Sequence, residues 1–269
     1  MTDIPPGDAY LSDTPALAGH AGTQPDLFLR WNRIPHAATS VDLVVFLHGF
    51  SQSGGTMPLA EKVERSGMIL GGRARPTLAM LPRGNWLRHY YYNFPALLDG
   101  GIDLLIAYGL HWLSEMRGSA AALDRFILAA HSGGGMPAID VIAGAQAQPD
   151  ELYVFDGLYG RDPSRGDPLQ GIETVDRWLG DRLAQEPARP GALRVPFIES
   201  QTGPFSREVS RLIAARLDTA DPTTRPALAR RYRVEASGVQ HSQVARRAFP
   251  DLLADPAAEI DWYAPPPTL

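Results

Sequence analysis

The sequence predicts an α/β protein built on a doubly wound, mostly parallel β-sheet flanked by helices. Short apolar runs rich in β-branched residues, such as residues 41–47 (VDLVVFL), are typical of strands buried on both faces of a sheet. Segments with the spacing of amphipathic helices separate these runs, and this alternation favours parallel strands joined by crossover helices. The chain has 269 residues, and we expect a single domain over residues 1–269.

The elements follow one another along the whole chain without an internal repeat. Alternating or continuous apolar segments predict strands over residues 26–34, 41–47, 76–81, 125–130, 151–155, 194–199 and 230–236. Helical spacing predicts helices over residues 58–70, 102–117, 136–147, 172–185, 205–217 and 242–254. In such sheets the chemistry takes place at the carboxyl ends of the strands, so the polar residues there are the candidates for function.

The composition excludes several classes of function. The net charge is -5 without a basic cluster, so nucleic acid is not an expected partner. There is no cysteine, which excludes disulfides, a thiolate nucleophile and cysteine-bound metals. The N-terminus lacks a signal-peptide pattern, and no apolar stretch approaches the ~20 residues of a membrane span. We therefore expect a cytoplasmic protein without a membrane span. Lys62 is the only lysine.

The segment Ala130-His131-Ser132-Gly133-Gly134 lies where a buried strand is expected to end and a helix to begin. A serine on such a sharp turn has a strained backbone that exposes its hydroxyl, and small residues on either side let two chain segments nearly touch. The alternative is an ordinary capping serine on a glycine-rich turn. The pattern resembles the nucleophile elbow Gly-x-Ser-x-Gly of the α/β-hydrolase family, with Ala130 in place of the first glycine. The resemblance covers residues 26–254 in the order and type of elements, and it implies that Ser132 is the nucleophile.

A second motif, His48-Gly49, follows the strand 41–47. In the α/β hydrolases a His-Gly turn at this place presents a backbone N–H to the oxyanion, and the residue after the nucleophile presents another. The resemblance thus implies Phe50 and Gly133 as oxyanion donors, with Ser51 as a weaker candidate. We expect the His48 side chain only to hold the turn.

A base must activate the serine, because its hydroxyl is a poor nucleophile near neutral pH. In the resembling family the chain order is serine, acid, histidine. His241 is the only histidine after Ser132, and it lies in the loop that follows the last expected strand. His241 is therefore the predicted base.

Two carboxylates are candidates for the acid that orients the base. Asp156 follows the strand 151–155, and Glu199 closes the strand 194–198. Most α/β hydrolases place the acid after the later strand, and a minority, including pancreatic-type lipases, after the earlier one. We favour Asp156 because Gly157 behind it fits a tight turn, and Glu199 remains the alternative.

Residues 82–92 should overhang the active-site edge. Trp86 and Tyr90 are expected to line a substrate pocket, and Arg83 or Arg88 to hold a carboxylate. The alternative is a packed surface loop without contact to substrate.

Residues 157–193 form the segment where such folds often carry a small cap. Asp162 and Asp167 in that segment match no ion-binding loop, so no metal is expected.

Together these features predict a serine hydrolase that cleaves a small-molecule carboxylic ester through an acyl-enzyme, without a cofactor. An amidase or peptidase with the same residues is one alternative. A non-catalytic binding module on the same fold is the other.

Overall fold

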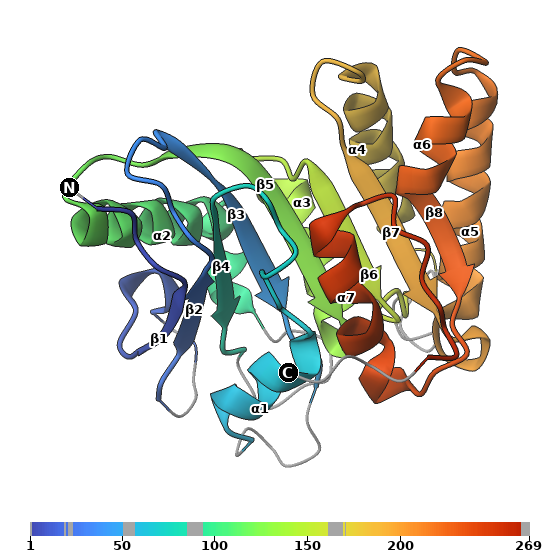
Figure 1. The fold of residues 1–269 in the computed structure, drawn as a ribbon. Coiled ribbons are helices and arrows are strands. Elements are labelled where there is room, and N and C mark those ends of the chain that lie inside the picture. Colours follow the sequence, from blue (N-terminus) through green and yellow to red (C-terminus); the bar gives the residue numbers. More distant parts are fainter. Residues whose placement is uncertain are drawn as a thin grey trace.

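An eight-stranded sheet with the order β1-β2-β4-β3-β5-β6-β7-β8 runs through the molecule (Figure 1). The computed structural model describes residues 2–18, 20, 24–50, 57–84, 94–160, 169 and 171–264. The strands are β1 (Gly7–Leu11), β2 (Leu27–Trp31), β3 (Ser40–Leu47), β4 (Thr77–Pro82), β5 (Ala122–His131), β6 (Glu151–Phe155), β7 (Ala192–Phe197) and β8 (Tyr232–Ala236). Strands β3 to β8 are parallel, whereas β1 and β2 are antiparallel to their neighbours, which confirms the mostly parallel sheet.

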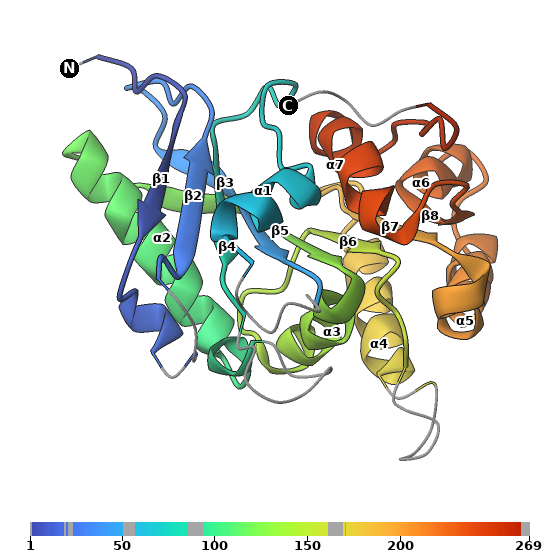
Figure 2. The same ribbon diagram turned by 90° about the horizontal axis from the view of Figure 1, so that it is seen from below.

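Helices cover both faces of this sheet (Figure 2). They are α1 (Leu59–Ser66), α2 (Gly101–Arg117), α3 (Gly135–Gly144), α4 (Ile172–Ala184), α5 (Glu199–Asp218), α6 (Arg225–Arg231) and α7 (Val244–Ala254). Helices α1 and α7 pack on one face, and α2 to α5 pack on the other. Within the described parts of the chain, no helix has the length and apolar character needed to cross a membrane.

Each central strand supplies side chains to two cores. In β3, Leu43 and Val45 point into the core under α2 to α5, and Val44 and Phe46 point into the core under α1 and α7. Successive side chains of a strand face opposite sides of the sheet, so a strand covered on both sides needs a continuous apolar run. Fully burying such a side chain contributes about 1.5–3 kcal/mol, which explains why these runs dominate the sequence pattern.

Some elements differ from the sequence expectations. Strand β1 was not expected, because this edge strand alternates half-buried and exposed positions and has no apolar run. Helix α6 was not expected either, and β8 begins at Tyr232 rather than at residue 230. Helix α5 begins at Glu199 instead of residue 205, so Glu199 belongs to a helix and not to the end of a strand.

The segment 157–193, where a cap was expected, contains α4. Val175, Trp178 and Leu179 of this helix are buried in the core under α2 to α5. Helix α4 is therefore the crossover helix between β6 and β7. Residues 161–168 and 170 lie outside the described residues, so a cap there stays a prediction.

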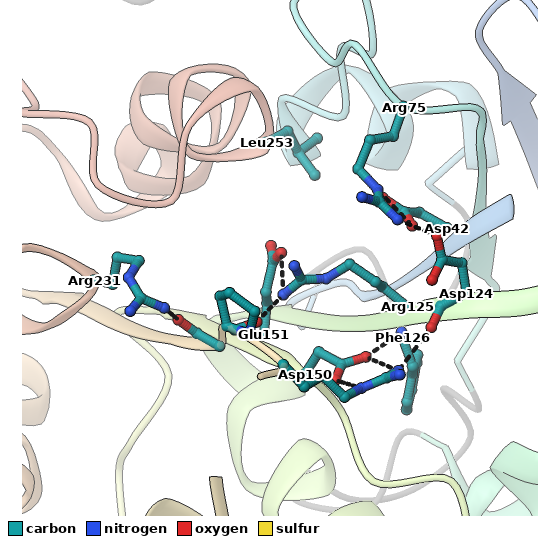
Figure 3. Close-up of polar contacts among 12 residues, drawn as sticks. Asp42, Arg75, Asp124, Arg125, Phe126, Asp150, Glu151, Arg231 and Leu253 are labelled. Carbon is teal, nitrogen blue, oxygen red and sulfur yellow. Dashed lines mark hydrogen bonds and ion pairs between the residues drawn. The ribbon is translucent and has the colours of Figure 1, made fainter. Parts of the chain in front are cut away.

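At the amino edge of the sheet, buried carboxylates pair with arginines (Figure 3). Asp150 accepts hydrogen bonds from the Phe126 N–H at 3.0 Å and from the Arg182 guanidinium at 2.9 Å. Asp42 accepts one from the Arg75 guanidinium at 3.0 Å. A buried carboxylate without partners costs several kcal/mol, so these contacts hold the amino ends of β3, β5 and β6 in place. The carboxyl ends lie at the opposite edge of the sheet.

Candidate active site

Ser132 lies directly after β5, at the carboxyl edge of the sheet, and begins a short 3-10 turn that leads into α3. Its φ is +52°, in the left-handed region that residues with a side chain rarely adopt. Such strain persists only where the surroundings enforce it, and it is common at functional sites. The strand, turn and helix expected around this serine are therefore present.

Glycines enclose this turn because neighbouring backbone leaves no room for a Cβ atom. A Cβ on Gly134 would lie 2.3 Å from the Leu47 carbonyl oxygen, and one on Gly49 would lie 2.7 Å from the Ser132 Cβ. The close approach expected two residues after Ser132 is thus present. It also brings the His48-Gly49 turn beside the serine.

His241 follows β8 and contacts Ser132 from across the sheet edge. Its Nε2 lies 2.8 Å from the Ser132 Oγ, and its Nδ1 lies 2.6 Å from the Asp156 Oδ2. Because a carboxylate only accepts, Nδ1 carries the proton, and Nε2 is left to accept from the serine hydroxyl. The His241 side chain is 32 % exposed, so the contact is accessible from solvent.

Asp156 is fully buried, with a φ of +45° directly after β6. Its Oδ1 accepts hydrogen bonds from the Ile198 N–H at 2.9 Å and from the Thr202 hydroxyl at 2.6 Å. Its Oδ2 faces His241. Both oxygens are occupied, so this carboxylate is held in one orientation and its burial is compensated.

Glu199, the alternative acid, does not occupy that place. Its side chain is 60 % exposed on the first turn of α5, where it pairs with Arg207. The carboxylate at hydrogen-bonding distance from His241 Nδ1 is that of Asp156.

His131 supports the backbone of His241. Its Nε2 donates to the His241 carbonyl oxygen at 2.9 Å, and the two rings lie 4.9 Å apart. Burial, reinforced by the nearby His241, lowers the pKa of His131 to about 4. His131 is therefore neutral near pH 7 and adds no charge beside the candidate base.

The His48 side chain holds the turn, as expected. Its Nε2 accepts from the Gly84 N–H at 3.0 Å, so its Nδ1 carries the proton and donates to the Gly49 carbonyl oxygen at 2.9 Å. Lys62 of α1 donates to the same oxygen at 2.8 Å. Phe50 follows Gly49 in this turn and Gly133 follows Ser132, and their roles as oxyanion donors stay predictions.

Of the residues expected to bind substrate, Arg83 lies within the described part of the chain. It is only 3 % exposed, and its guanidinium donates to the carbonyl oxygens of Pro25 at 3.0 Å and Met57 at 3.1 Å. These contacts hold backbone together, and binding of a substrate carboxylate by Arg83 stays a prediction. Trp86, Arg88 and Tyr90, like the weaker oxyanion candidate Ser51, lie outside the described residues.

Sequence reasoning missed Thr202 and Tyr159. Thr202 reaches Asp156 from α5, and the Tyr159 hydroxyl lies 3.4 Å from His241 Nε2. Both act across elements far apart in the sequence, and no local motif marks them. The one sequence signal for Tyr159 was its position three residues after Asp156, in a loop expected at the carboxyl edge of the sheet.

Among the described residues, no group of three or more His, Asp or Glu side chains is arranged to hold a metal ion. The contacts of Ser132, His241 and Asp156 bring together a hydroxyl, an imidazole that can accept its proton, and a carboxylate that orients the imidazole.

No protein-family model matches the chain, and no curated protein matches it. Solved structures do. A ferulic acid esterase superposes with a TM-score of 0.52 at 12 % identity, over 95 % of this chain and 98 % of that chain. An α/β serine hydrolase without lid from Xanthomonas campestris gives a TM-score of 0.42 at 13 % identity, over 94 % of each chain. A lipase/esterase from Lactobacillus plantarum gives 0.44 at 11 % identity, over 88 % of this chain and 90 % of that chain.

At such identities a match bears on the fold alone. The strand order, the helices on both faces and the superposition over nearly the full length of both chains agree on one architecture. The protein has the α/β-hydrolase fold.

Proposed function

We propose that the protein is a serine hydrolase that cleaves carboxylic esters through an acyl-enzyme intermediate. The observation that carries the proposal is the continuous line of contacts from Asp156 through His241 to Ser132, at 2.6 Å and 2.8 Å. These residues come from three different loops at one edge of the sheet, and mutual geometry of this kind is what nucleophilic catalysis requires.

In the first half-reaction the Ser132 Oγ attacks the ester carbonyl while His241 Nε2 takes the hydroxyl proton. The carbonyl oxygen becomes an oxyanion, which the N–H groups of Phe50 and Gly133 stabilise. The intermediate then collapses: the bond from carbon to the alcohol oxygen breaks, and His241 returns the proton to that oxygen. The alcohol leaves, and the acyl group stays on Ser132.

In the second half-reaction water replaces the alcohol. His241 takes a proton from the water as its oxygen attacks the acyl carbon, and a second oxyanion forms at the same N–H groups. When this intermediate collapses, the proton returns to Ser132 Oγ and the carboxylic acid leaves. Asp156 stabilises the imidazolium in both halves and keeps its proton on Nδ1.

The similarity to a ferulic acid esterase supports an ester rather than an amide as substrate. We further propose that Trp86, Arg88 and Tyr90, in the segment after β4, contact the substrate. Arg83 would act beside them by anchoring the backbone where that segment begins.

The test combines a covalent probe with a substrate panel. A fluorophosphonate should label the native protein at Ser132, as seen by intact mass and peptide mapping, and p-nitrophenyl esters should be hydrolysed. Ser132→Ala should abolish labelling and turnover while circular dichroism stays that of the wild type. Absence of labelling in the folded wild-type protein would refute the proposal.

The same panel separates the alternatives. Matched p-nitroanilides report amide cleavage, and faster anilide than ester turnover would identify an amidase. A folded protein that neither reacts with the probe nor cleaves any substrate would be a binding module.

A further inference from the structure

The single lysine of the chain is buried beneath the His48-Gly49 turn. Lys62 lies on α1 with 4 % of its surface exposed, and its Nζ donates to the Gly49 carbonyl oxygen at 2.8 Å. Burying an amine costs free energy, and an apolar side chain of similar volume would fill the same space at no such cost. The position of the amine therefore calls for a reason other than stability.

The Gly49 carbonyl accepts two hydrogen bonds from buried side chains. One comes from Lys62 Nζ, and the other comes from His48 Nδ1 at 2.9 Å. A cavity of about 30 Å³ lies beside these groups, and its lining includes Lys62, Arg65 and His131. Both of these hydrogen bonds are buried, so the carbonyl oxygen faces the interior of the protein.

The Gly49 carbonyl and the Phe50 N–H belong to one peptide unit. Because a trans peptide is planar, the N–H points away from the carbonyl, on the side opposite Lys62 and His48. Donors on the oxygen polarise the whole unit and make its N–H a stronger donor. They also fix its rotation, which a glycine leaves unusually free. Gly49 cannot be replaced by a stiffer residue, since a Cβ there would meet Ser132.

We propose that Lys62 is a positioning residue for the oxyanion site: with His48 it orients and polarises the Gly49–Phe50 peptide, whose N–H receives the oxyanion. The inference rests on the proposed function, because it assigns Phe50 N–H to that role. Lys62 acts through the peptide and does not touch the substrate.

The Lys62 amine changes its protonation state near neutral pH. Burial lowers the pKa of its ammonium from the ordinary 10.5 to about 7; Arg65 and Arg83 lower it as well, and Glu61 raises it. Among the residues that the structure describes, the charged and titratable groups that act on the amine are Glu61 and Arg65 on α1, Arg83 after β4, His48 after β3 and His131 at the end of β5. Because the protonated amine polarises the peptide more than the neutral amine, the oxyanion donor weakens as pH rises through about 7.

The first experiment does not depend on enzymatic activity. Labelling with [¹³Cε]lysine gives one lysine resonance, because Lys62 is the only lysine, and its titration reports the charge. In the same protein, ¹⁵N-phenylalanine labelling reports the Phe50 amide, assigned by its loss in Phe50→Leu. The Phe50 amide shift should follow the Lys62 titration with the same midpoint. A Phe50 amide that does not respond while Lys62 titrates would overturn the inference, even in a protein that proves inactive.

The second experiment measures kcat and KM for p-nitrophenyl acetate between pH 5.5 and 8.5. Lys62→Met keeps the volume and removes every donor, so kcat should fall about tenfold, less than the ~10²–10³ for loss of an oxyanion donor itself. KM should change less than about twofold. Lys62→Gln, a neutral donor, should recover part of kcat, and the ratio of wild-type to Lys62→Gln turnover should shrink as pH rises through 7.

Ser66→Ala is the matched control on the same helix. Ser66 is buried and donates to the Val63 carbonyl at 2.6 Å, so its loss perturbs α1 without touching the Gly49 carbonyl. This variant should keep the wild-type kcat. A folded Lys62→Met with unchanged kcat would overturn the inference, whereas a wild-type protein that fluorophosphonate does not label would instead overturn the proposed function.

Discussion

Two of the three residues in the contact line, Ser132 and Asp156, have positive φ angles. Each directly follows a buried parallel strand, and each side chain turns from the sheet edge toward His241. Packing elsewhere in the fold offsets the free-energy cost of this strained backbone. The strained backbone turns each short side chain toward His241, whereas an extended backbone would direct it into the core. At the scale of single residues, the position of the Ser132 and Asp156 side chains therefore takes precedence over an unstrained backbone.

The assignment of the acid is tested by two neutral substitutions. Asp156→Asn should keep the fold but favour the wrong imidazole tautomer, with a loss of up to ~10⁴ in kcat. Glu199→Gln, on an exposed side chain, should leave kcat within about twofold. Steady-state kinetics on both variants, with circular dichroism as the folding check, would refute the assignment if Glu199→Gln were the damaging change.

Thr202 should matter through Asp156 alone. Thr202→Val keeps the shape but removes the hydroxyl that donates to Asp156 Oδ1 at 2.6 Å, leaving only the Ile198 N–H on that oxygen. The freed carboxylate should orient His241 less well, and we expect kcat to fall about tenfold with KM little changed, as for other groups that support a catalytic residue. Thr202→Ser should restore turnover. Equal losses in both variants would indicate a packing defect instead.

At the scale of elements, the sequence predicted the central strands well because they are buried on both faces. It failed where burial is one-sided or a local signal misleads. The half-exposed β1 has no apolar run, and α5 begins at Glu199, before the expected residue 205, and contains Pro204. That error also placed Glu199 at a strand end and kept it in consideration as the acid.

The residues of the candidate site also divide into those that the sequence indicated and those that it did not. Ser132 and His241 followed from a motif and from chain order, and Asp156 from its place after a strand. Thr202 and Lys62 did not follow, because no local motif indicates the contact of Thr202 with Asp156 or of Lys62 with the Gly49 carbonyl oxygen. On its helix, Lys62 has the local pattern of an ordinary polar residue, and only the packing of α1 reveals that it is buried.

The elbow between β5 and α3 should tolerate no side chain at Gly134. Gly134→Ala would place its Cβ 2.3 Å from the Leu47 carbonyl oxygen, so strand and helix must separate. We expect a destabilisation of about 1–3 kcal/mol, typical of overpacking, together with loss of esterase activity. Urea unfolding measures the first effect and p-nitrophenyl acetate hydrolysis the second. Gly71→Ala, whose Cβ would meet nothing within 4 Å, is the control and should match the wild type in both.

At the scale of the whole molecule, the two edges of the sheet have different tasks. The amino edge holds the ion pairs of Asp42 and Asp150, which fix the strands (Figure 3). The carboxyl edge holds the strained turns and the contact line. The paired strands β5 to β8 run between the two edges, and Ser132, Asp156 and His241 follow the carboxyl ends of β5, β6 and β8.

Buried neutral histidines make this fold sensitive to acid. His131 has a pKa lowered to about 4 from 6.5, and burial also lowers the pKa of His48 and His20. The unfolded chain takes up protons first as pH falls, so the His131 contribution to stability is complete above 6.5 and is lost as pH falls through about 4. Urea unfolding at pH 7, 5.5 and 4.5 should show falling stability. His131→Gln should flatten that fall, and an unchanged slope in this variant would contradict the role of His131.

Lys62 is the only lysine of the chain, and it is buried. The folded protein therefore presents no reactive side-chain amine to solvent. A reagent that acylates amines reaches Lys62 only when α1 lifts away from the turn that holds Gly49. The rate of acylation at this one side chain therefore measures how often that part of the molecule opens. The same movement releases the Gly49 carbonyl oxygen. The acylation rate of Lys62 therefore also reports how often the candidate active site loses this contact.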